Sequence, residues 1–363
     1  MSKPSTTIGR QRGLTLLELL VSIAISMIVL AAAFRVVSFS MQSSTLVMQR
    51  GEMQSELRSA ANQIVRDLQQ AGTGMPTGGI PLPSQASGGT NPVFGCDSTT
   101  CYLTTNNKFT QGVFYKVTPG HDAGPTTLET TDAIVLAFKD PTLNWTAYTT
   151  TALTDAGDQL TMPASTTPAV NDVAVGITVG DVLLLTNSLG SALGVVTGVN
   201  GSTRVISFAN LDPLNINQSG APVGNIKSLR YNPIPGSGPH YPAVTVSRIT
   251  MITYFLQSVS TTNGPDVRLM RQVGAHKPVP VAEHIDDLQF TYDVFDDTTS
   301  TLTANLPDAA TGSPATPKPN QIRKINMTIT ARALRPNNKG LFDRIAYSTS
   351  VGPRNLAYHD RYN

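Results

Sequence analysis

The pattern of hydrophobic and polar positions divides this 363-residue chain into an apolar helix, an amphipathic helix and a series of alternating strands. Leu14 to Phe34 form an apolar run of 21 residues in which Glu18 is the one charged side chain. At a rise of about 1.5 Å per residue, a helix of this length crosses a hydrocarbon core of about 30 Å. The run therefore predicts a transmembrane helix over residues 14–34.

A second helical pattern follows the apolar run. From Arg35 to Ala71 the chain contains no proline and one glycine, Gly51. Apolar side chains recur every three to four residues, at Met53, Leu57, Ala60, Ala61, Ile64, Leu68 and Ala71. The polar face carries Glu52, Glu56, Arg58, Arg66 and Asp67. This spacing predicts one N-terminal helix over residues 14–71, ended by Gly72, Gly74 and Pro76, with a break at Gly51 as the alternative.

The remaining chain predicts strands. Residues 72–128 are rich in Gly, Pro, Ser and Thr, which is typical of an irregular connection with short strands. Apolar runs at 133–138 and 181–185, a hairpin signal at 200–202, and apolar–polar alternation at 288–294 and 325–332 follow. Alternation with one apolar face indicates half-buried antiparallel strands. The expected fold class is α+β, with the long helix packed on antiparallel sheets and a β-rich extracytoplasmic domain at 129–363.

The residues before the apolar run are basic. Lys3, Arg10 and Arg12 precede it without any acid, so the positive-inside rule keeps them in the cytoplasm and places the C-terminal part outside. An ordinary secretory signal, cleaved near the alanines at 31–33, and a plain signal anchor are two interpretations. Neither explains Glu18, because a charge inside a membrane span costs about 2.5–3.5 kcal/mol.

A third interpretation rests on five features together: a basic leader, Gly13, the hydroxyl of Thr15, Glu18 and an unbroken apolar helix. This combination resembles the class III leader of type IV pilins and pseudopilins, although Leu14 stands where most of that family has phenylalanine. The resemblance implies that a prepilin peptidase removes residues 1–13 by cleaving between Gly13 and Leu14. It also implies methylation of the new Leu14 amine.

The same resemblance gives Glu18 a role. In pilin-like filaments, the glutamate at this position is thought to pair with the N-terminal amine of a neighbouring subunit, which would neutralise two charges and set the axial register. A helix N-terminus also favours a negative charge. The alternatives are that Glu18 reaches the membrane interface or pairs with its own amine.

Further along the chain, the order of segments is similar to that of PilW-type minor pilins and, more distantly, the J-type pseudopilin of type II secretion. The similar stretches are 66–72, 180–185, 249–256, 267–273, 285–292 and 347–355. The resemblance implies a pilin-like fold and a minor pilin that primes or caps pilus assembly without catalysis. Its partners would be the prepilin peptidase, the major pilin and other minor pilins. It would span the inner membrane once, with its C-terminal domain in the periplasm, until it enters the pilus.

Two alternatives concern function. The first alternative is a pseudopilin of a type II secretion system, because pseudopilins have the same kind of N-terminal helix as pilins and are processed by the same peptidase. Otherwise the chain would be a pilus-tip adhesin, or a membrane-anchored extracytoplasmic enzyme. A pocket that gathers one histidine with a carboxylate would favour the enzyme.

Composition argues against nucleic acid as a partner. Only 14% of residues are charged, and loss of the three leader cations leaves 23 basic and 24 acidic residues, a net charge of −1. No basic patch with interleaved aromatic residues is present, whereas DNA binding requires clustered cations.

Cysteine and histidine usage gives few candidate sites. Cys96 and Cys101 are separated by four intervening residues and are expected to form a disulfide in an oxidising compartment, with free thiols as the alternative. The five histidines, His121, His240, His276, His284 and His359, are dispersed and have no metal-ligand spacing. His284 precedes an acidic cluster of Asp286, Asp287, Asp293, Asp296 and Asp297, which lacks the alternating form of a calcium loop. We therefore expect no metal, no cofactor and no enzymatic activity.

Overall fold

The computed structural model describes residues 15–103, 109, 112–125, 127–128, 130–143, 149–150, 153–231, 240–261, 264–296, 299–307, 319–334, 336 and 340–356. The predicted leader and cleavage site, with Gly13 and Leu14, lie outside the described residues. The chain divides into two compact units, Met1–Glu52 and Met53–Asn363, and each is described by itself.

One α-helix, α1, covers Leu16–Gln70, and the described residues contain no other α-helix. It continues through Gly51, so the alternative of a break there is wrong. Gly72 follows the helix with a φ of 83°, a conformation that favours glycine, and its N–H donates to the carbonyl of Ala137 at 2.8 Å. The apolar face predicted from the periodicity is confirmed, because Met53, Leu57, Ala60, Ala61, Ile64 and Leu68 are buried.

Asp67 does not belong to the polar face, to which the sequence pattern assigned it. Its side chain is buried, and the carboxylate accepts hydrogen bonds from the Tyr254 hydroxyl at 2.6 Å and from Arg271 Nε at 2.8 Å. A buried carboxylate is tolerated when it is paired and hydrogen-bonded. Its two partners come from strands far along the chain, which explains why helical periodicity alone gave the wrong answer.

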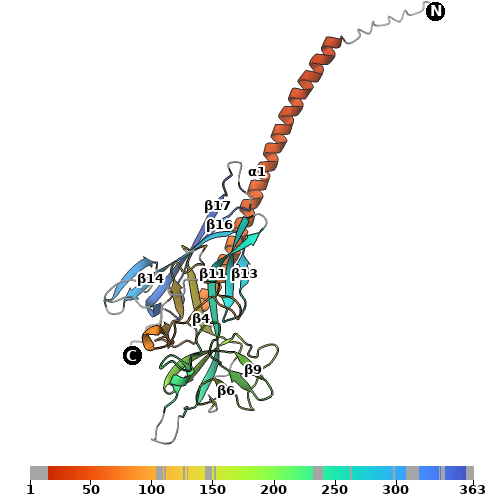
Figure 1. The fold of residues 1–363 in the computed structure, drawn as a ribbon. Coiled ribbons are helices and arrows are strands. Elements are labelled where there is room, and N and C mark those ends of the chain that lie inside the picture. Colours follow the sequence, from red (N-terminus) through yellow and green to blue (C-terminus); the bar gives the residue numbers. More distant parts are fainter. Residues whose placement is uncertain are drawn as a thin grey trace, which may run out of the picture. The chain divides into compact units, whose positions relative to one another are not determined.

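The strands of the described residues form four antiparallel sheets. Two small sheets pair β1 (Ile80–Pro81) with β2 (Val113–Phe114), and β6 (Gln159–Thr161), β10 (Val205–Ser207) and β9 (Gly198–Asn200) in that order. The eight-stranded sheet has the path β13 (Val279–Ala282), β12 (Gly264–Val273), β11 (Val244–Thr261), β4 (Ala133–Lys139), β3 (Val117–Gly120). In the same sheet, β5 (Thr149–Thr150) and β7 (Val182–Asn187) pair with β11, and β8 (Gly190–Val195) pairs with β7. Figure 1 labels β4, β11 and β13 of this sheet.

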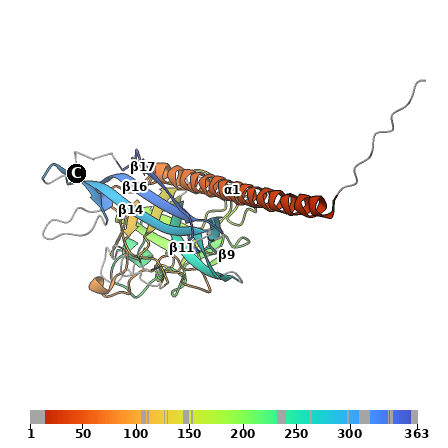
Figure 2. The same ribbon diagram turned by 90° about the horizontal axis from the view of Figure 1, so that it is seen from above.

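The four-stranded sheet has the order β15 (Thr301–Leu306), β14 (Ile285–Asp296), β16 (Ile322–Arg332), β17 (Arg344–Val351) (Figure 2). Short 3₁₀ helices occur at Gln85–Ser87, Ile226–Leu229 and Pro319–Gln321. The strands predicted at 133–138, 181–185, 288–294 and 325–332 are confirmed as β4, β7, β14 and β16. The predicted hairpin is confirmed as β9–β10, with Asn200 opposite Val205. The fold is α+β, with one long N-terminal helix and a β-sheet-rich C-terminal part.

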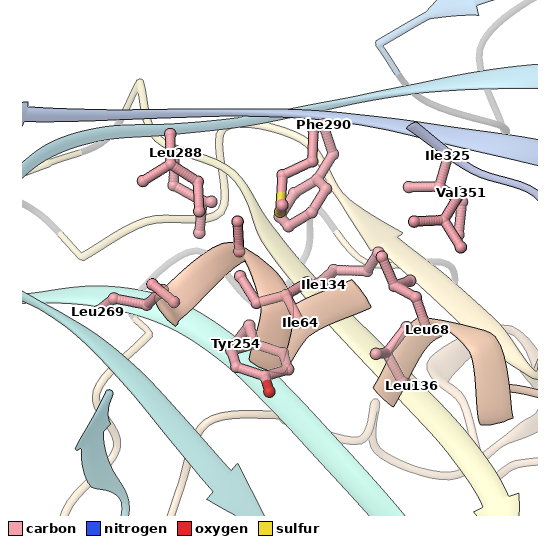
Figure 3. Packing of buried hydrophobic residues seen from close by; sticks show 14 of the residues in the cluster. Ile64, Leu68, Ile134, Leu136, Tyr254, Leu269, Leu288, Phe290, Ile325 and Val351 are labelled. Atoms are coloured by element: carbon pink, nitrogen blue, oxygen red, sulfur yellow. The ribbon is translucent and has the colours of Figure 1, made fainter. Parts of the chain in front are cut away.

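The main core lies between the two large sheets. Figure 3 shows Ile64 and Leu68 of α1 with Tyr254 and Leu136 on one side and Phe290 on the other. Successive residues of a strand point to opposite faces of the sheet. Along β11, Ile252, Tyr254 and Leu256 accordingly belong to this core, whereas Met251 and Phe255 belong to a second core on the other face. The eight-stranded sheet is thus covered on both faces, and loop residues such as Phe94 and Leu214 belong to the second core.

Candidate functional site

The first part of α1 exposes its apolar surface in the isolated chain. Every residue from Thr15 to Thr45 is exposed, and Leu16 and Phe34 have exposed fractions of 78% and 67%. Within the part of the chain that the structure describes, α1 is the one helix long and apolar enough to cross a membrane. An exposed apolar surface of this extent marks a site that contacts a membrane or another protein. This segment is therefore the first candidate functional site.

Glu18 forms a capping box with Thr15 at the start of α1. The Thr15 hydroxyl accepts from the backbone N–H of Glu18 at 3.3 Å, and Glu18 Oε2 accepts from the backbone N–H of Thr15 at 3.0 Å. The Thr15 hydroxyl also donates to the same carboxylate oxygen at 3.0 Å. These contacts satisfy N–H groups that every helix leaves unpaired at its first turn. Glu18 Oε1 has no hydrogen-bond partner among the described residues.

The polar side chains of the apolar run lie on one face of the helix. Thr15, Glu18, Ser22 and Ser26 are separated by three or four residues, which is the spacing of neighbours on one helix face. The Ser26 hydroxyl donates to the Ser22 carbonyl at 2.8 Å, so the hydrogen of that hydroxyl is satisfied within the helix. Small residues at this spacing allow a second helix to approach closely within a membrane. The sequence analysis missed this stripe, although the spacing of the serines could have revealed it.

The predicted disulfide is confirmed, since Cys96 and Cys101 are bonded to each other. The acidic cluster near His284 is not brought together. His284 contacts Asp266 at 2.8 Å, Asp287 contacts Gln289, and Asp293 contacts Lys324 at 3.3 Å. The other described members have separate partners, Arg344 for Asp286 and Thr299 for Asp296. Asp297 and His359 lie outside the described residues.

A different group, His121, Asp122 and Asp132, offers three ligand atoms within 4.8 Å of one another. His121 Nδ1 lies 3.0 Å from Asp132 Oδ1, and Asp132 also accepts from the backbone N–H groups of Asp122 and Phe290. Burial raises the pKa of Asp132, although these hydrogen bonds act in the opposite direction. Both oxygens of Asp132 are thus already engaged by the chain, which is the arrangement of a structural carboxylate that joins a turn to β14.

One groove brings a histidine close to carboxylates. It has a volume of about 600 Å³ and is lined by His276, Asp97 and Asp212 among other residues. His276 Nε2 lies 2.8 Å from Asp181 Oδ1. This is the arrangement that the enzyme alternative requires. However, within the described part of the chain no hydrogen bond joins His276 to a hydroxyl that could act as a nucleophile. The absence of enzymatic activity therefore stays a prediction.

Comparison with known proteins identifies the N-terminal segment. A protein-family model described as the prokaryotic N-terminal methylation motif matches residues 8–34. No curated protein and no solved structure matches the chain. The matched residues include Gly13, Leu14, Thr15 and Glu18 and the apolar start of α1. The chain therefore carries the class III N-terminal signal of type IV pilins and pseudopilins, which anchors it in a membrane through its N-terminal helix.

Proposed function

We propose that this protein is a minor pilin, of the PilW type, that primes or caps the assembly of a type IV pilus. The observation that carries the proposal is the methylation motif at residues 8–34, on a helix whose apolar surface the chain leaves exposed from Thr15 to Thr45. A subunit that joins a filament through this helix needs such a surface. The proposed role is structural, with no catalysis, no cofactor and no nucleic acid.

The geometry of Glu18 supports a role in subunit registry. Cleavage after Gly13 creates a cation at the Leu14 amine, and Glu18 is four residues away. One carboxylate oxygen caps the helix through Thr15, and the other is open to a second donor. Glu18 can therefore bind the amine of a neighbouring subunit without losing its cap. The stripe of Ser22 and Ser26 on the same face would let the neighbouring helix come close.

The proposed location follows from charge and redox chemistry. The basic leader stays in the cytoplasm, the apolar run lies in the inner membrane, and the Met53–Asn363 unit lies in the periplasm before entry into the pilus. The bonded pair Cys96–Cys101 is compatible with an oxidising compartment. The proposed partners are the prepilin peptidase, the major pilin and the other minor pilins.

Mass spectrometry of the mature N-terminus tests the processing step. We expect a chain that begins with N-methylated Leu14. Gly13→Leu should leave unprocessed precursor in the membrane, whereas Gly9→Leu, in the same leader, should be processed normally. A retained leader, or a chain that begins near Phe34, would refute the proposal.

Filament composition tests the role of Glu18. Glu18→Ala should still be cleaved but should reduce the amount of this subunit in sheared pili, while Glu52→Ala should leave it unchanged. Unchanged incorporation of the Glu18 variant would rule out registry by this residue. Co-purification with a major pilin supports the pilus role. Co-purification with a type II secretion platform would instead identify a pseudopilin.

A further inference from the structure

The tip of the β16–β17 hairpin gathers exposed apolar side chains. The backbone N–H of Ala333 donates to the carbonyl of Asp343 at 2.7 Å, so Leu334 and Phe342 flank the hairpin just beyond this pair. Leu334, Leu341 and Phe342 have exposed fractions of 58%, 64% and 41%. The other exposed large apolar residues that the structure describes in the β-rich unit are scattered over separate turns and strands. Single exposed apolar residues are normal on a protein surface, whereas a cluster marks a contact site.

Arginines surround the apolar residues of the tip. Arg332 Cζ lies 5.2 Å from the centre of the Phe342 ring, and the exposed Arg344 forms an ion pair with Asp286. Across residues 332–344 the sequence contains four basic residues and one acid. Guanidinium groups bind phosphates, and apolar side chains flanked by cations are typical of segments that lie in a membrane interface. We propose that this tip docks on the lipid bilayer in which α1 is anchored, with its apolar side chains in the headgroup layer.

The tip lies at the end of the unit from which α1 leads to the predicted membrane span. The opposite end of β17 lies beside α1, since Val351 lines a pocket together with Val65 and Gln69. Figure 1 shows the β16–β17 hairpin running along α1 from there. The strand from Val351 to Arg344 covers about 23 Å, and the helix from Gln69 to Met53 covers about 24 Å. The tip is therefore level with Met53, where α1 enters the unit.

The exposed apolar surface of α1 is longer than a bilayer core. It continues past Phe34 through Val36 and Phe39 to Met48, and all of these side chains are exposed. The helix from Leu16 to Met48 is about 48 Å long, whereas the hydrocarbon core is about 30 Å thick. A helix with a longer apolar surface than the core accommodates the excess by tilting. Tilting of α1 lowers the β-rich unit towards the membrane and lets the tip reach the headgroup layer.

A bilayer is the partner that this tip meets first. Because α1 anchors the chain in a membrane, the tip stays near lipid, and its docking is an intramolecular step with a high effective concentration. A weak second contact is then enough to hold the unit against the surface. A protein strand would instead pair with a strand edge through backbone hydrogen bonds and would not require apolar side chains at a hairpin tip. The inference goes beyond the proposed pilin function and depends only on the membrane anchor.

A fluorescent probe on the tip tests the proposal. Cys96 and Cys101 are the two cysteines of the sequence and are bonded to each other, so Leu341→Cys supplies one free thiol for a nitrobenzoxadiazole dye. The labelled full-length protein is placed in nanodiscs of phosphatidylcholine and phosphatidylglycerol, with and without a phosphatidylcholine that carries a nitroxide near its headgroup. We expect the nitroxide lipid to lower the fluorescence about twofold, because the dye lies within the headgroup layer.

Leu302→Cys is the matched control. Leu302 has an exposed fraction of 61%, close to that of Leu341, and lies on β15 of the same sheet. At one end of β14, Ile285 is opposite Ala331, beside the tip, and at the other end Phe295 is opposite Leu302. The two leucines therefore lie at opposite ends of one sheet, and the nitroxide lipid should leave the fluorescence of the Leu302 probe unchanged.

A second change tests whether the apolar side chains hold the tip at the membrane. Leu334→Glu in the labelled Leu341→Cys protein places a charge at the tip, so the quenching should fall to the level of the Leu302 probe. Thr301→Glu, at an exposed position on β15, should leave the quenching of the Leu341 probe unchanged. Near-ultraviolet circular dichroism verifies that both variants keep the fold.

Three results would overturn the inference. The first is equal fluorescence change of the Leu341 and Leu302 probes. The second is quenching of the Leu341 probe that Leu334→Glu does not reduce, which would show that the tip lies near lipid without binding it. The third is a Leu341 probe that lipid does not quench but that a co-reconstituted major pilin shields, which would identify a protein contact. None of these results depends on cleavage at Gly13, so they leave the proposed pilin function standing.

Discussion

Replacement of Asp67 by alanine is predicted to lower the free energy of unfolding of the Met53–Asn363 unit by about 3–5 kcal/mol. Asp67 lies on α1 with 6% of its side chain exposed, and its Oδ2 is 2.8 Å from Nε of Arg271. The same oxygen accepts from the hydroxyl of the fully buried Tyr254 at 2.6 Å. Removal of the carboxylate leaves a largely buried guanidinium without its counter-charge and a buried hydroxyl without its acceptor.

The size of the effect follows from comparison with milder changes. Tyr254→Phe removes one hydrogen bond to a charged group, which is worth about 1.5–3 kcal/mol, and leaves the ion pair with Arg271 intact. Burial and the neighbouring Asp67 carboxylate both raise the pKa of Tyr254, so its hydroxyl stays a donor at neutral pH. The double variant Asp67→Leu with Arg271→Leu removes both charges and should cost less than the sum of the two single changes.

Urea unfolding of the full-length protein in detergent micelles measures these differences. Near-ultraviolet circular dichroism follows the transition, because it reports the packing of buried tyrosines such as Tyr254. The control is Glu56→Ala, an exposed acid on the same helix, with an expected change below about 0.5 kcal/mol. If Asp67→Ala were no more destabilising than Glu56→Ala, the buried network would not hold α1 to the sheet.

Three further predictions concern other parts of the chain. Burial raises the pKa of Asp97, but its hydrogen bonds outweigh burial and lower the pKa to about 2 from its usual 3.8. The contribution of Asp97 to stability is therefore present above pH 4 and is lost as the pH falls towards 2. Asp97→Asn should remove that part of the acid dependence, measured as the urea midpoint against pH. Replacement of Cys96 and Cys101 by serine opens a six-residue loop and should lower the free energy of unfolding by about 2 kcal/mol in the same assay. An equal decrease on adding reductant to the wild type would support this prediction, and an unchanged free energy of unfolding would contradict it. Ser22→Leu and Ser26→Leu should preserve membrane insertion and cleavage but reduce subunit incorporation into pili, because leucine blocks close helix approach; normal incorporation would show that the stripe is not a contact face.

The elements with local causes could be predicted from the sequence. The buried face of α1 follows from apolar residues such as Leu57 and Ile64 at helical spacing, and the end of the helix follows from Gly72. The strand β14 follows from alternation, since its apolar side chains Leu288 and Phe290 face the core. In each case the signal lies within one stretch of chain, where steric and solvation preferences act directly.

Elements that depend on distant partners could not be predicted. Asp67 meets Tyr254 and Arg271 across 187 and 204 residues, and nothing near Asp67 in the sequence specifies them. The groove lined by His276 has the same property, because its walls come from five separate segments of the chain. His276 looked isolated along the chain, yet the fold brings it to 2.8 Å from Asp181, 95 residues earlier. Separation along the chain therefore does not exclude a site, because the fold can bring distant side chains together.

The two parts of α1 meet different physical requirements, and this difference links the fold to the proposed function. From Met53 onward its apolar side chains are buried between two sheets of the same chain, and Asp67 finds its charge partner there. Before that point the side chains from Thr15 to Thr45 have no cover from the chain, and Glu18 has one oxygen open to a donor. A helix gains little stability from its own hydrogen bonds in water and depends on packing. The first part therefore requires lipid or neighbouring helices. Under the proposed function, the Leu14 amine that cleavage after Gly13 creates supplies the cation for the carboxylate within it.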